Sequence, residues 1–452
     1  MAAMDLVIRN GRVLTPQGEQ ALEIAVSDGR IVELAPRISG SAKTEIDATG
    51  LHVFPGVIDA HVHFNEPGRT EWEGFATGSA ALAAGGGTCF FEMPLNASPP
   101  TLDAASFHLK KQAAEAHSLT DFALWGGLTP GNPDRMEELA DCGVVGFKAF
   151  MSSSGIEDFP RADDWTLYRG MEIAAKRCLP VAVHAESEEI TSRLTAQIRA
   201  RGGRGWNDYL QSRPAIAEAE AIQRAIFLAG ETGCSLHIVH VSTARGVEIV
   251  RRARREWKVD VTCETCPHYL LLSEANLSEI GARAKCAPPL RSPEESRSLW
   301  WQLSQGNIDL VASDHSPAPQ SMKGGDDAFA IWGGIAGVQT TLVSLLGEGK
   351  LPPDSAARLT SANVAKRFKI PNKGQITVGF DADFALVDLK RPHTLKREDL
   401  LDRHKLSPYV GRTFAATVRT TIARGRVIFQ DGRAIPGEKA RLIVPNRGGG
   451  RA

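Results

Sequence analysis

The sequence has few cysteines, almost no net charge and no long hydrophobic run. Its seven cysteines are an odd number scattered over 452 residues, unlike the dense cysteines of a secreted disulfide scaffold. A net charge of −1 argues against nucleic acid or an anionic membrane as a partner. No stretch of about 18 apolar residues occurs, and the first residues lack the pattern of a signal peptide. These absences predict a cytoplasmic protein with reduced thiols.

Two styles of sequence divide the chain. Residues 1–52 and 371–446 contain short apolar segments separated by turn residues, which indicate strands and hairpins. Residues 53–370 alternate short apolar runs with longer helical stretches, which is typical of βα units. Each flanking part is too short to bury a core alone, so we expect both chain ends to form one small composite β-sandwich domain. Residues 447–452 are expected to form a disordered tail.

The central part contains eight short apolar runs. They cover residues 53–62, 88–93, 122–125, 144–147, 180–183, 236–239, 259–263 and 308–312. Eight βα units in about 300 residues predict an α/β fold of the (β/α)8 TIM-barrel type. The longest insertion between runs is expected to hold a helix over 218–229, and a further helix is expected over 353–369.

Side chains that can bind metals follow five of these runs. His61 and His63 end the first run, Lys148 follows the fourth, His184 the fifth, His240 the sixth and Asp314 the eighth. Strand side chains alternate between faces, so His61 and His63 point the same way and can bind one ion together. Such a pair alone could arise by chance. Six side chains at the C-terminal ends of barrel strands, where these barrels carry their chemistry, predict a metal site.

Lys148 is the unusual member of this set, because an ammonium group has no lone pair for a metal. Four neutral imidazoles and one carboxylate carry about −1, which is little against two divalent ions. A lysine converted by CO2 to a carbamate, N6-carboxylysine, would supply an anionic bridging ligand. The alternative is a lysine that forms a salt bridge at the barrel mouth. The surrounding metal ligands favour the carbamate.

With its composite β domain and these ligands, the chain resembles the cyclic amidohydrolases. That family includes dihydroorotase, hydantoinase or dihydropyrimidinase, and allantoinase, and the segment Pro55-Gly-Val-Ile-Asp-Ala-His-Val-His63 is shared by all of them. The allantoinase branch is the most similar at residues 64–75, 92–96, 145–148, 263–269, 284–291, 332–337 and 403–412. Asn65 stands where dihydroorotases carry an arginine, and Ser152-Ser-Ser-Gly replaces a tyrosine of hydantoinases.

The resemblance implies a binuclear metal centre. His61, His63 and Asp314 would hold one ion, and His184 and His240 the other, with carboxylated Lys148 between them. Zinc is expected first, with cobalt, manganese, iron or nickel as alternatives. A hydroxide shared by the ions would attack the ring amide, and Asp314 would be the catalytic proton carrier. The reaction would convert allantoin, a small-molecule substrate, to allantoate in purine degradation.

The resemblance also implies a homotetramer and substrate contacts from Asn96, Arg291 and Gly334. Hydantoinase-type and dihydroorotase-type ring opening are the alternatives among enzymes. A metal-free binding homologue is the alternative outside enzymes, and the presence of all six ligands argues against it. Strand alternation further predicts that His237, three residues before His240, lies on the opposite face and outside the site.

Overall fold

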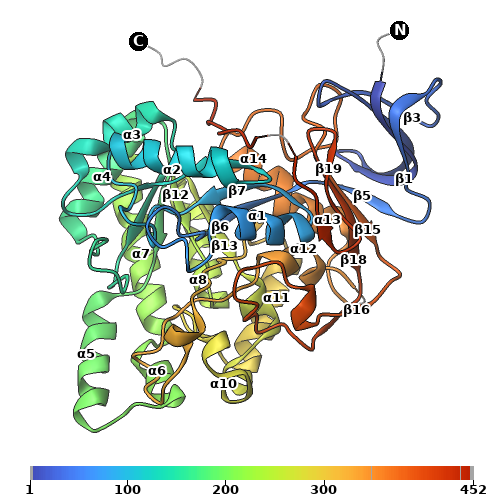
Figure 1. The fold of residues 1–452 in the computed structure, drawn as a ribbon. Coiled ribbons are helices and arrows are strands. Elements are labelled where there is room, and N and C mark those ends of the chain that lie inside the picture. The colour runs from blue at the N-terminus through green and yellow to red at the C-terminus, as the bar shows by residue number, and fades with distance from the viewer. Residues whose placement is uncertain (1–3, 348, 438, 448–452) are drawn as a thin grey trace.

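Strands from both ends of the chain join in one nine-stranded sheet (Figure 1). The computed structural model describes residues 4–347, 349–437 and 439–447. The strands of this sheet are β1 (Met4–Thr15), β2 (Gly18–Ser27), β3 (Arg30–Ala35), β4 (Ala42–Asp47), β5 (His52–Pro55), β15 (Phe384–Asp388), β18 (Thr417–Ala423), β19 (Arg426–Gln430) and β20 (Arg433–Ala434). They run in the order β20-β19-β18-β15-β5-β1-β2-β3, and β4 pairs with β1. The antiparallel pairing of β5 with β15, Pro55 opposite Phe384, joins the two chain ends.

The sheet is stable because both chain ends contribute to one core. Leu6 and Ile8 of β1 pack in the same buried cluster as Ile24 of β2, Phe384 of β15 and Ile422 of β18. The side chains of this cluster come from both chain ends, so each end completes the core of the other. The predicted composite β domain is therefore confirmed.

The central part of the chain folds into a closed parallel barrel. Its strands are β6 (Val57–Val62), β7 (Gly87–Glu92), β8 (Asp121–Leu124) continued by β9 (Gly126–Gly127), β10 (Phe147–Phe150), β11 (Val181–His184), β12 (Leu236–Ile238), β13 (Val261–Thr265) and β14 (Leu310–Val311). The N–H of Val145 donates to the Leu124 carbonyl at 2.9 Å, and the N–H of His63 donates to the His315 carbonyl at 2.8 Å. These bonds join the two sheets into a ring, as the TIM-barrel prediction requires.

The first apolar run, 53–62, is two strands and not the single strand that the sequence suggests. β5 belongs to the composite sheet, whereas β6 pairs with β7 in the barrel. Gly56 lies between them, and a Cβ added there would lie 2.2 Å from the Thr88 Oγ1. The sequence of this run is hydrophobic throughout because both strands are buried. Hydrophobicity therefore gives no sign of the point where the neighbouring strand changes from β15 to β7.

Helices surround the barrel and extend from its mouth. They are α1 (Phe75–Ala84), α2 (Ala104–His117), α3 (Met136–Cys142), α4 (Asp164–Lys176), α5 (Glu188–Ala200), α6 (Trp206–Ser212), α7 (Ala215–Thr232), α8 (Ala244–Arg252), α9 (Pro267–Leu271), α10 (Glu274–Ile280), α11 (Pro293–Ser304), α12 (Thr341–Ser344), α13 (Pro353–Ala357) and α14 (Asn363–Arg367). Helix α7 contains the predicted helix 218–229. The predicted helix 353–369 forms as α13 and α14, joined by the π-helical turn η6 (Arg358–Ala362). In Figure 1, α5, α6 and α10 extend beyond one end of the barrel.

Short elements complete the described chain. They are η1 (Pro133–Arg135), η2 (Ala253–Trp257), η3 (Gly281–Ala284), η4 (Gln320–Lys323), η5 (Val338–Thr340), η7 (Arg397–Asp399), β16 (His393–Thr394) and β17 (Thr413–Phe414). None of the described helices is long and apolar enough to cross a membrane.

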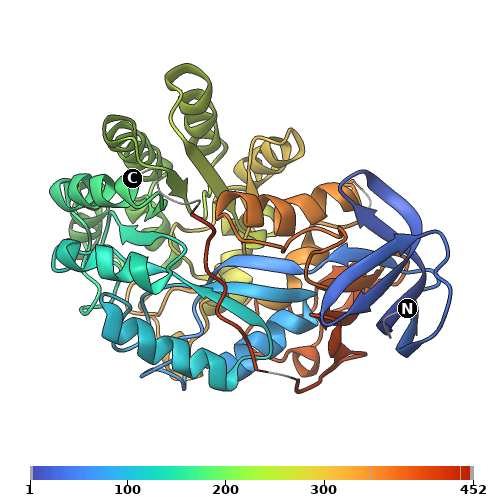
Figure 2. The ribbon, with the colours of Figure 1, turned by 90° about the horizontal axis from the view of Figure 1, so that it is seen from above.

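The C-terminal segment leaves the composite sheet and crosses the barrel (Figure 2). Leu442 pairs with Phe122 of β8 in a parallel bridge, and the Ile443 N–H donates to the Phe122 carbonyl at 2.7 Å. Arg447 donates to the Ala140 carbonyl. The sequence analysis assigns residues up to 446 to the small β domain. In the structure, Leu442 and Ile443 contact the barrel strand β8 instead. Of the predicted disordered tail, residues 448–452 lie outside the described residues.

Candidate functional site

Three predicted metal ligands meet at the barrel mouth. His61 and His63 lie at the end of β6, and Asp314 follows β14. The Asp314 Oδ1 lies 3.2 Å from the His61 Nε2 and 3.5 Å from the His63 Nε2. One ligand atom from each side chain lies within 4.8 Å of the others, so this group could hold a metal ion. Burial lowers the pKa values of both imidazoles, which favours the neutral form that binds metals.

His184 and His240 form a second group beside the first. The His184 Nδ1 lies 3.1 Å from the His240 Nε2, and the rings of His61 and His240 have centroids 5.4 Å apart. The ring of Phe150 stacks on His184 with a centroid distance of 4.6 Å and restricts its orientation. Burial lowers the pKa values of His184 and His240 as well. Two buried, neutral imidazoles therefore direct nitrogen lone pairs into one small space.

Lys148 on β10 has no partner that satisfies its charge. Its side chain is fully buried, and its Nζ has no hydrogen-bond acceptor within the described residues. The Phe150 ring centroid lies 5.0 Å away. Burial lowers the pKa of Lys148 to about 8, although Asp314 and Glu264 oppose the shift. Burial therefore increases the fraction of Lys148 that is the neutral amine, which is the form that can react with CO2.

The backbone is strained at two of these positions. His240 has a φ of 39° and Asp314 a φ of 46°, values in the left-handed region that such residues seldom occupy. Both residues lie just beyond the end of a strand, β12 and β14. Strain of this kind persists where the surrounding structure fixes the backbone, and it concentrates at functional sites.

Glu264 on β13 is a site residue that the sequence analysis missed. Its Oε1 lies 2.6 Å from the His61 Nδ1, and its Oε2 lies 3.0 Å from the His237 Nε2. The His237 Nδ1 lies 2.8 Å from the Thr262 Oγ1. Glu264 therefore fixes the His61 ring with Nε2 toward Asp314. Burial raises the pKa of Glu264 to about 8, and Asp314 adds to the shift while Lys148 opposes it.

The prediction that His237 lies outside the site is wrong. The residue is fully buried and contacts Glu264. The alternation argument fails because β12 ends at Ile238, so His240 is no longer in strand geometry. The sequence did contain one indication of the contact between Glu264 and the two histidines. A glutamate inside a buried strand needs a polar partner, because an unpaired buried carboxylate is costly.

A second carboxylate orients His184. The Glu186 Oε2 lies 2.8 Å from the His184 Nε2, and Arg213 donates to the same oxygen. Burial would raise the pKa of Glu186, but Arg213 and His184 outweigh it and hold the pKa at about 2. Glu186 is thus an ionised acceptor that turns the Nδ1 of His184 toward His240. Asp59 acts on the backbone instead, accepting the N–H groups of His61 at 3.1 Å and Ser313 at 3.2 Å.

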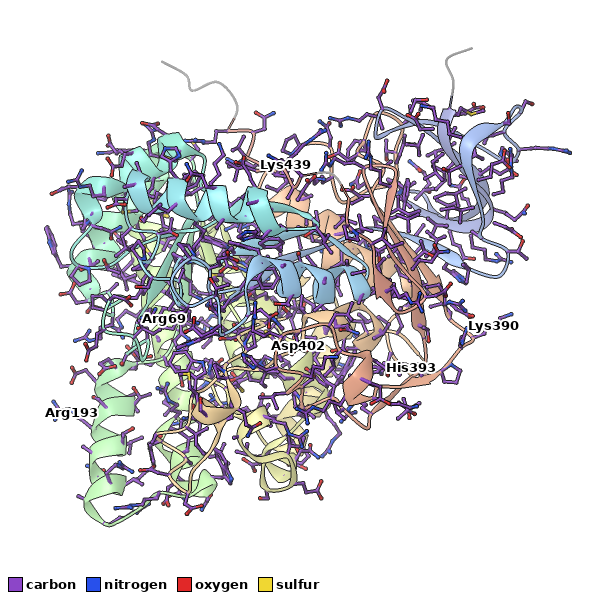
Figure 3. The ribbon with its side chains drawn as sticks, in the orientation of Figure 1. Arg69, Arg193, Lys390, His393, Asp402 and Lys439 are labelled. Carbon is purple, nitrogen blue, oxygen red and sulfur yellow. The ribbon has the colours of Figure 1, made fainter. Side chains whose placement is uncertain are left out.

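A cavity of about 430 Å³ opens over these groups, a size typical of small-molecule sites. Asn96 and Gly334, two predicted substrate contacts, line it. The Asn96 Nδ2 lies 3.3 Å from the His63 Nδ1. The Asn96 carbonyl accepts a bond of 3.0 Å from Arg69, which Figure 3 places on the barrel side, away from Lys390 and His393.

Arg291, the third predicted substrate contact, lies behind the cavity wall and is absent from the described residues that line the cavity. Its Nε donates to the Ser242 Oγ at 2.9 Å, and its Nη1 donates to the Arg213 carbonyl at 2.6 Å. A larger hollow, of about 840 Å³, lies on the outer surface of α7 and α8, and none of the predicted ligands lines it.

Comparison with known proteins identifies the group to which the chain belongs. The model of the amidohydrolase family matches residues 52–428. The chain belongs to the amidohydrolase family. It is therefore a hydrolase, and the resemblance drawn from the sequence motifs is confirmed. The match includes all six predicted metal ligands.

Individual amidohydrolases are similar over nearly the full length. The chain is 56% identical to an allantoinase of Rubrobacter xylanophilus, with 99% of each chain covered. It is 49% identical to an allantoinase of Deinococcus radiodurans, with 98% of this chain and 99% of the relative covered. Among solved structures, the L-hydantoinase (dihydropyrimidinase) of Arthrobacter aurescens superposes with a TM-score of 0.94 at 34% identity, covering 98% of this chain and 100% of the other.

Proposed function

We propose that this protein hydrolyses the hydantoin ring of allantoin to give allantoate, as a step in purine degradation. The observation that carries the proposal is the 56% identity, over 99% of both chains, to a relative named allantoinase. The cavity at the barrel mouth has the size for such a substrate and is lined by His61, His240 and Asp314. The polar side chains around it suit a small, neutral and strongly hydrogen-bonding ring.

We propose that the site holds two divalent ions, zinc foremost. His61, His63 and Asp314 would hold one, and His184 and His240 the other. Lys148 would lie between them as the carbamate, and its buried Nζ without an acceptor supports that role. Ions bound there would supply a hydroxide at neutral pH and polarise the carbonyl of the substrate.

The side chains of the chain itself would position the substrate and move the proton. Asp314 lines the cavity, and its Oδ1 lies within 3.5 Å of the Nε2 atoms of His61 and His63, so its carboxylate would take the proton of the attacking hydroxide and pass it to the departing ring nitrogen. Asn96 and Gly334 would contact the ring, and Arg291 would support the carbonyl of Arg213. Glu264 and Glu186 would keep the imidazoles in the required orientation.

A hydantoinase-type activity is the second candidate, because the Arthrobacter aurescens structure is so similar. The test compares hydrolysis of allantoin, dihydroorotate and 5,6-dihydrouracil by the metal-loaded protein. We expect the highest kcat/KM with allantoin. A higher value with 5,6-dihydrouracil or dihydroorotate would reject the proposed substrate. No hydrolysis of any of the three substrates, together with a failure to bind divalent metal, would instead favour the metal-free binding homologue.

We also propose a cytoplasmic homotetramer. The barrel domain, expected over residues 53–370, would begin at Val57 instead, because β5 belongs to the composite sheet. The proposal rests on the resemblance to the cyclic amidohydrolases and on the absence of a membrane-crossing helix among the described residues. Light scattering of the purified protein would show the mass of four chains. The mass of one or two chains would reject the tetramer, and recovery in the membrane fraction of cells would reject the location.

A further inference from the structure

One wall of the cavity is a segment without helix or strand. All six residues from Phe329 to Gly334, here called the wall segment, line the cavity. The N–H groups of Ala330 and Ile331 donate to the carbonyl of Asp327, within the same loop, at 3.0 and 3.2 Å. Two further backbone bonds reach neighbouring segments, from the Trp332 N–H to the Met322 carbonyl at 3.0 Å and from the Gly334 N–H to the Lys285 carbonyl at 2.8 Å. Because only two backbone bonds link this segment to its neighbours, side-chain contacts help to define its conformation.

Two buried lysines supply the remaining contacts. The Lys323 Nζ donates to the carbonyls of Gly334 at 2.6 Å, Trp332 at 3.1 Å and Ala282 at 3.3 Å. An ammonium group has three protons, so these acceptors satisfy all of them. Lys323 therefore links the wall segment to η3, the turn that precedes Lys285 in the chain.

Lys285 holds the other end of the wall segment. Its Nζ donates to the carbonyls of Ile331 and Phe329, and it lies 4.7 Å from the ring centroid of Tyr209. Two carbonyls and an aromatic face again satisfy the ammonium group. Lys285 and Lys323 are only 5% and 7% exposed, and none of the ion pairs of the described residues includes either of them.

Burying an ammonium group among neutral acceptors has a large desolvation cost. Burial lowers the pKa of Lys285 to about 8 and that of Lys323 to about 7. Arg213 lowers the pKa of Lys285 further, and Lys285 lowers the pKa of Lys323. An apolar side chain would fill the same space without this cost. A buried ammonium group is stable only while backbone carbonyls of the wall segment accept its hydrogen bonds. Each lysine therefore restricts the orientation of the peptide groups whose carbonyls it contacts.

We propose that Lys285 and Lys323 are positioning residues that fix the wall segment and thereby control how tightly substrate binds in the cavity. The proposal rests on the proposed function, because it takes this cavity as the substrate site. Neither lysine contacts the predicted metal ligands, so the hydrolytic step itself should depend on them less than substrate binding does.

The test replaces each lysine with methionine, which has a similar length and no hydrogen-bond donor. For Lys323→Met and Lys285→Met we expect the KM for allantoin to rise about tenfold, equivalent to losing one or two hydrogen bonds. We expect kcat and the metal content per chain to change much less. Lys369→Met is the matched control, because its Nζ also donates to a carbonyl, that of Cys178, but at an exposed position.

Hydrogen exchange of the substrate-free protein provides an independent readout. Amides of the wall segment should exchange faster in both variants, while those of strands β6 to β13 keep their wild-type rates. A fall in kcat with unchanged KM, unchanged exchange, or a failure of both variants to fold would overturn the proposal. If wild-type protein does not hydrolyse allantoin, the proposed function fails, whereas the exchange measurement still decides the role of the lysines.

Discussion

Lys148 is the residue whose chemistry most clearly distinguishes a metal centre from an ordinary polar cluster. Its buried Nζ has no acceptor within the described residues, and its pKa is lowered to about 8 by burial. We predict that Lys148→Ala loses most of its divalent metal and its hydrolytic activity, because the bridging anion is gone. Metal content by mass spectrometry and activity are measured on the same sample, with the exposed Lys176→Ala as control. Full metal content in Lys148→Ala would reject the carbamate bridge.

Glu264 contacts a predicted metal ligand and does not itself line the cavity. It contacts the Nδ1 of His61 at 2.6 Å and the Nε2 of His237 at 3.0 Å. We predict that Glu264→Gln weakens metal binding by about 10–100-fold, because an amide has one acceptor atom for two imidazoles. The measurement is a competition titration with a chelator. Glu248→Gln on the exposed surface of α8 should bind metal like wild type, and equal affinity of both variants would contradict the role of Glu264.

At the scale of elements, the junction between β5 and β6 joins the two parts of the molecule. A Cβ at Gly56 would lie 2.2 Å from the Oγ1 and 2.5 Å from the Cγ2 of Thr88 on β7. We predict that Gly56→Ala lowers the free energy of unfolding by about 1–3 kcal/mol, the usual cost of overpacking. Urea unfolding provides the measurement. Gly131→Ala, where an added Cβ would meet nothing within 4 Å, is the control.

The same junction allows a second comparison. Thr88→Ala removes both atoms nearest to the added Cβ, so the double variant Gly56→Ala/Thr88→Ala should regain part of the stability. If the double variant is as unstable as the sum of its two single variants, the close approach to Thr88 is not the cause.

At the scale of the whole molecule, a buried ion cluster links the barrel, the composite sheet and the C-terminal segment. The Lys373 Nζ lies 2.9 Å from Asp121 of β8, 3.0 Å from Asp381 and 2.6 Å from Asp383. Asp121 also accepts the N–H of Arg441 at 3.0 Å. Lys373 thus pairs with carboxylates from different parts of the fold. Arg424 also pairs with Asp121 at 3.2 Å, and Arg30 pairs with Asp381 at 2.9 Å.

The cluster makes stability depend on pH. Burial alone would lower the pKa of Lys373, but Asp383 and Asp121 outweigh it and raise the pKa well above its usual value. A raised lysine pKa contributes stability that is present below about pH 10.4 and is lost as the pH rises through the folded-state pKa. Burial also raises the pKa of Asp383, against the attraction of Lys373. Ionised Asp383 is thus costly without the lysine, and protonation relieves that cost.

We therefore predict that Lys373→Met lowers the free energy of unfolding at pH 8 by about 3–5 kcal/mol, because it leaves the buried Asp383 without its ammonium partner. The deficit relative to wild type should narrow toward pH 5, since the unpaired carboxylate can then take up a proton. Urea unfolding at both pH values tests this, with the exposed Lys369→Met as control. An equal deficit at both pH values would show that lost packing, and not charge, causes the effect.

Much of the site follows from positions along the chain. The predicted ligands could be found because they lie at, near or just after the C-terminal ends of barrel strands, which parallel strands bring together. The ligands are His61, His63, His184, His240, Asp314 and Lys148, of which Lys148 lies within the four-residue strand β10. His237 was misplaced because the alternation rule stops where β12 ends. Glu264 was missed because it lies inside the buried strand β13, and its partners His61 and His237 are far away in the sequence. The roles of Lys285 and Lys323 could not be predicted from a sequence motif, because their partners are backbone carbonyls, which every residue has.

The sequence by itself determined the eight βα units, the residue types of the metal ligands and the pairing of both chain ends in one β domain, because these follow from local periodicity and from strand order. Only the tertiary structure decided the break between β5 and β6 at Gly56 and the contact of Glu264 with His61. The same holds for the ion cluster around Lys373 and for the hydrogen bonds of Lys285 and Lys323 to the wall segment. Each of these depends on the distance between side chains far apart in the chain, and local patterns contain no information about that distance.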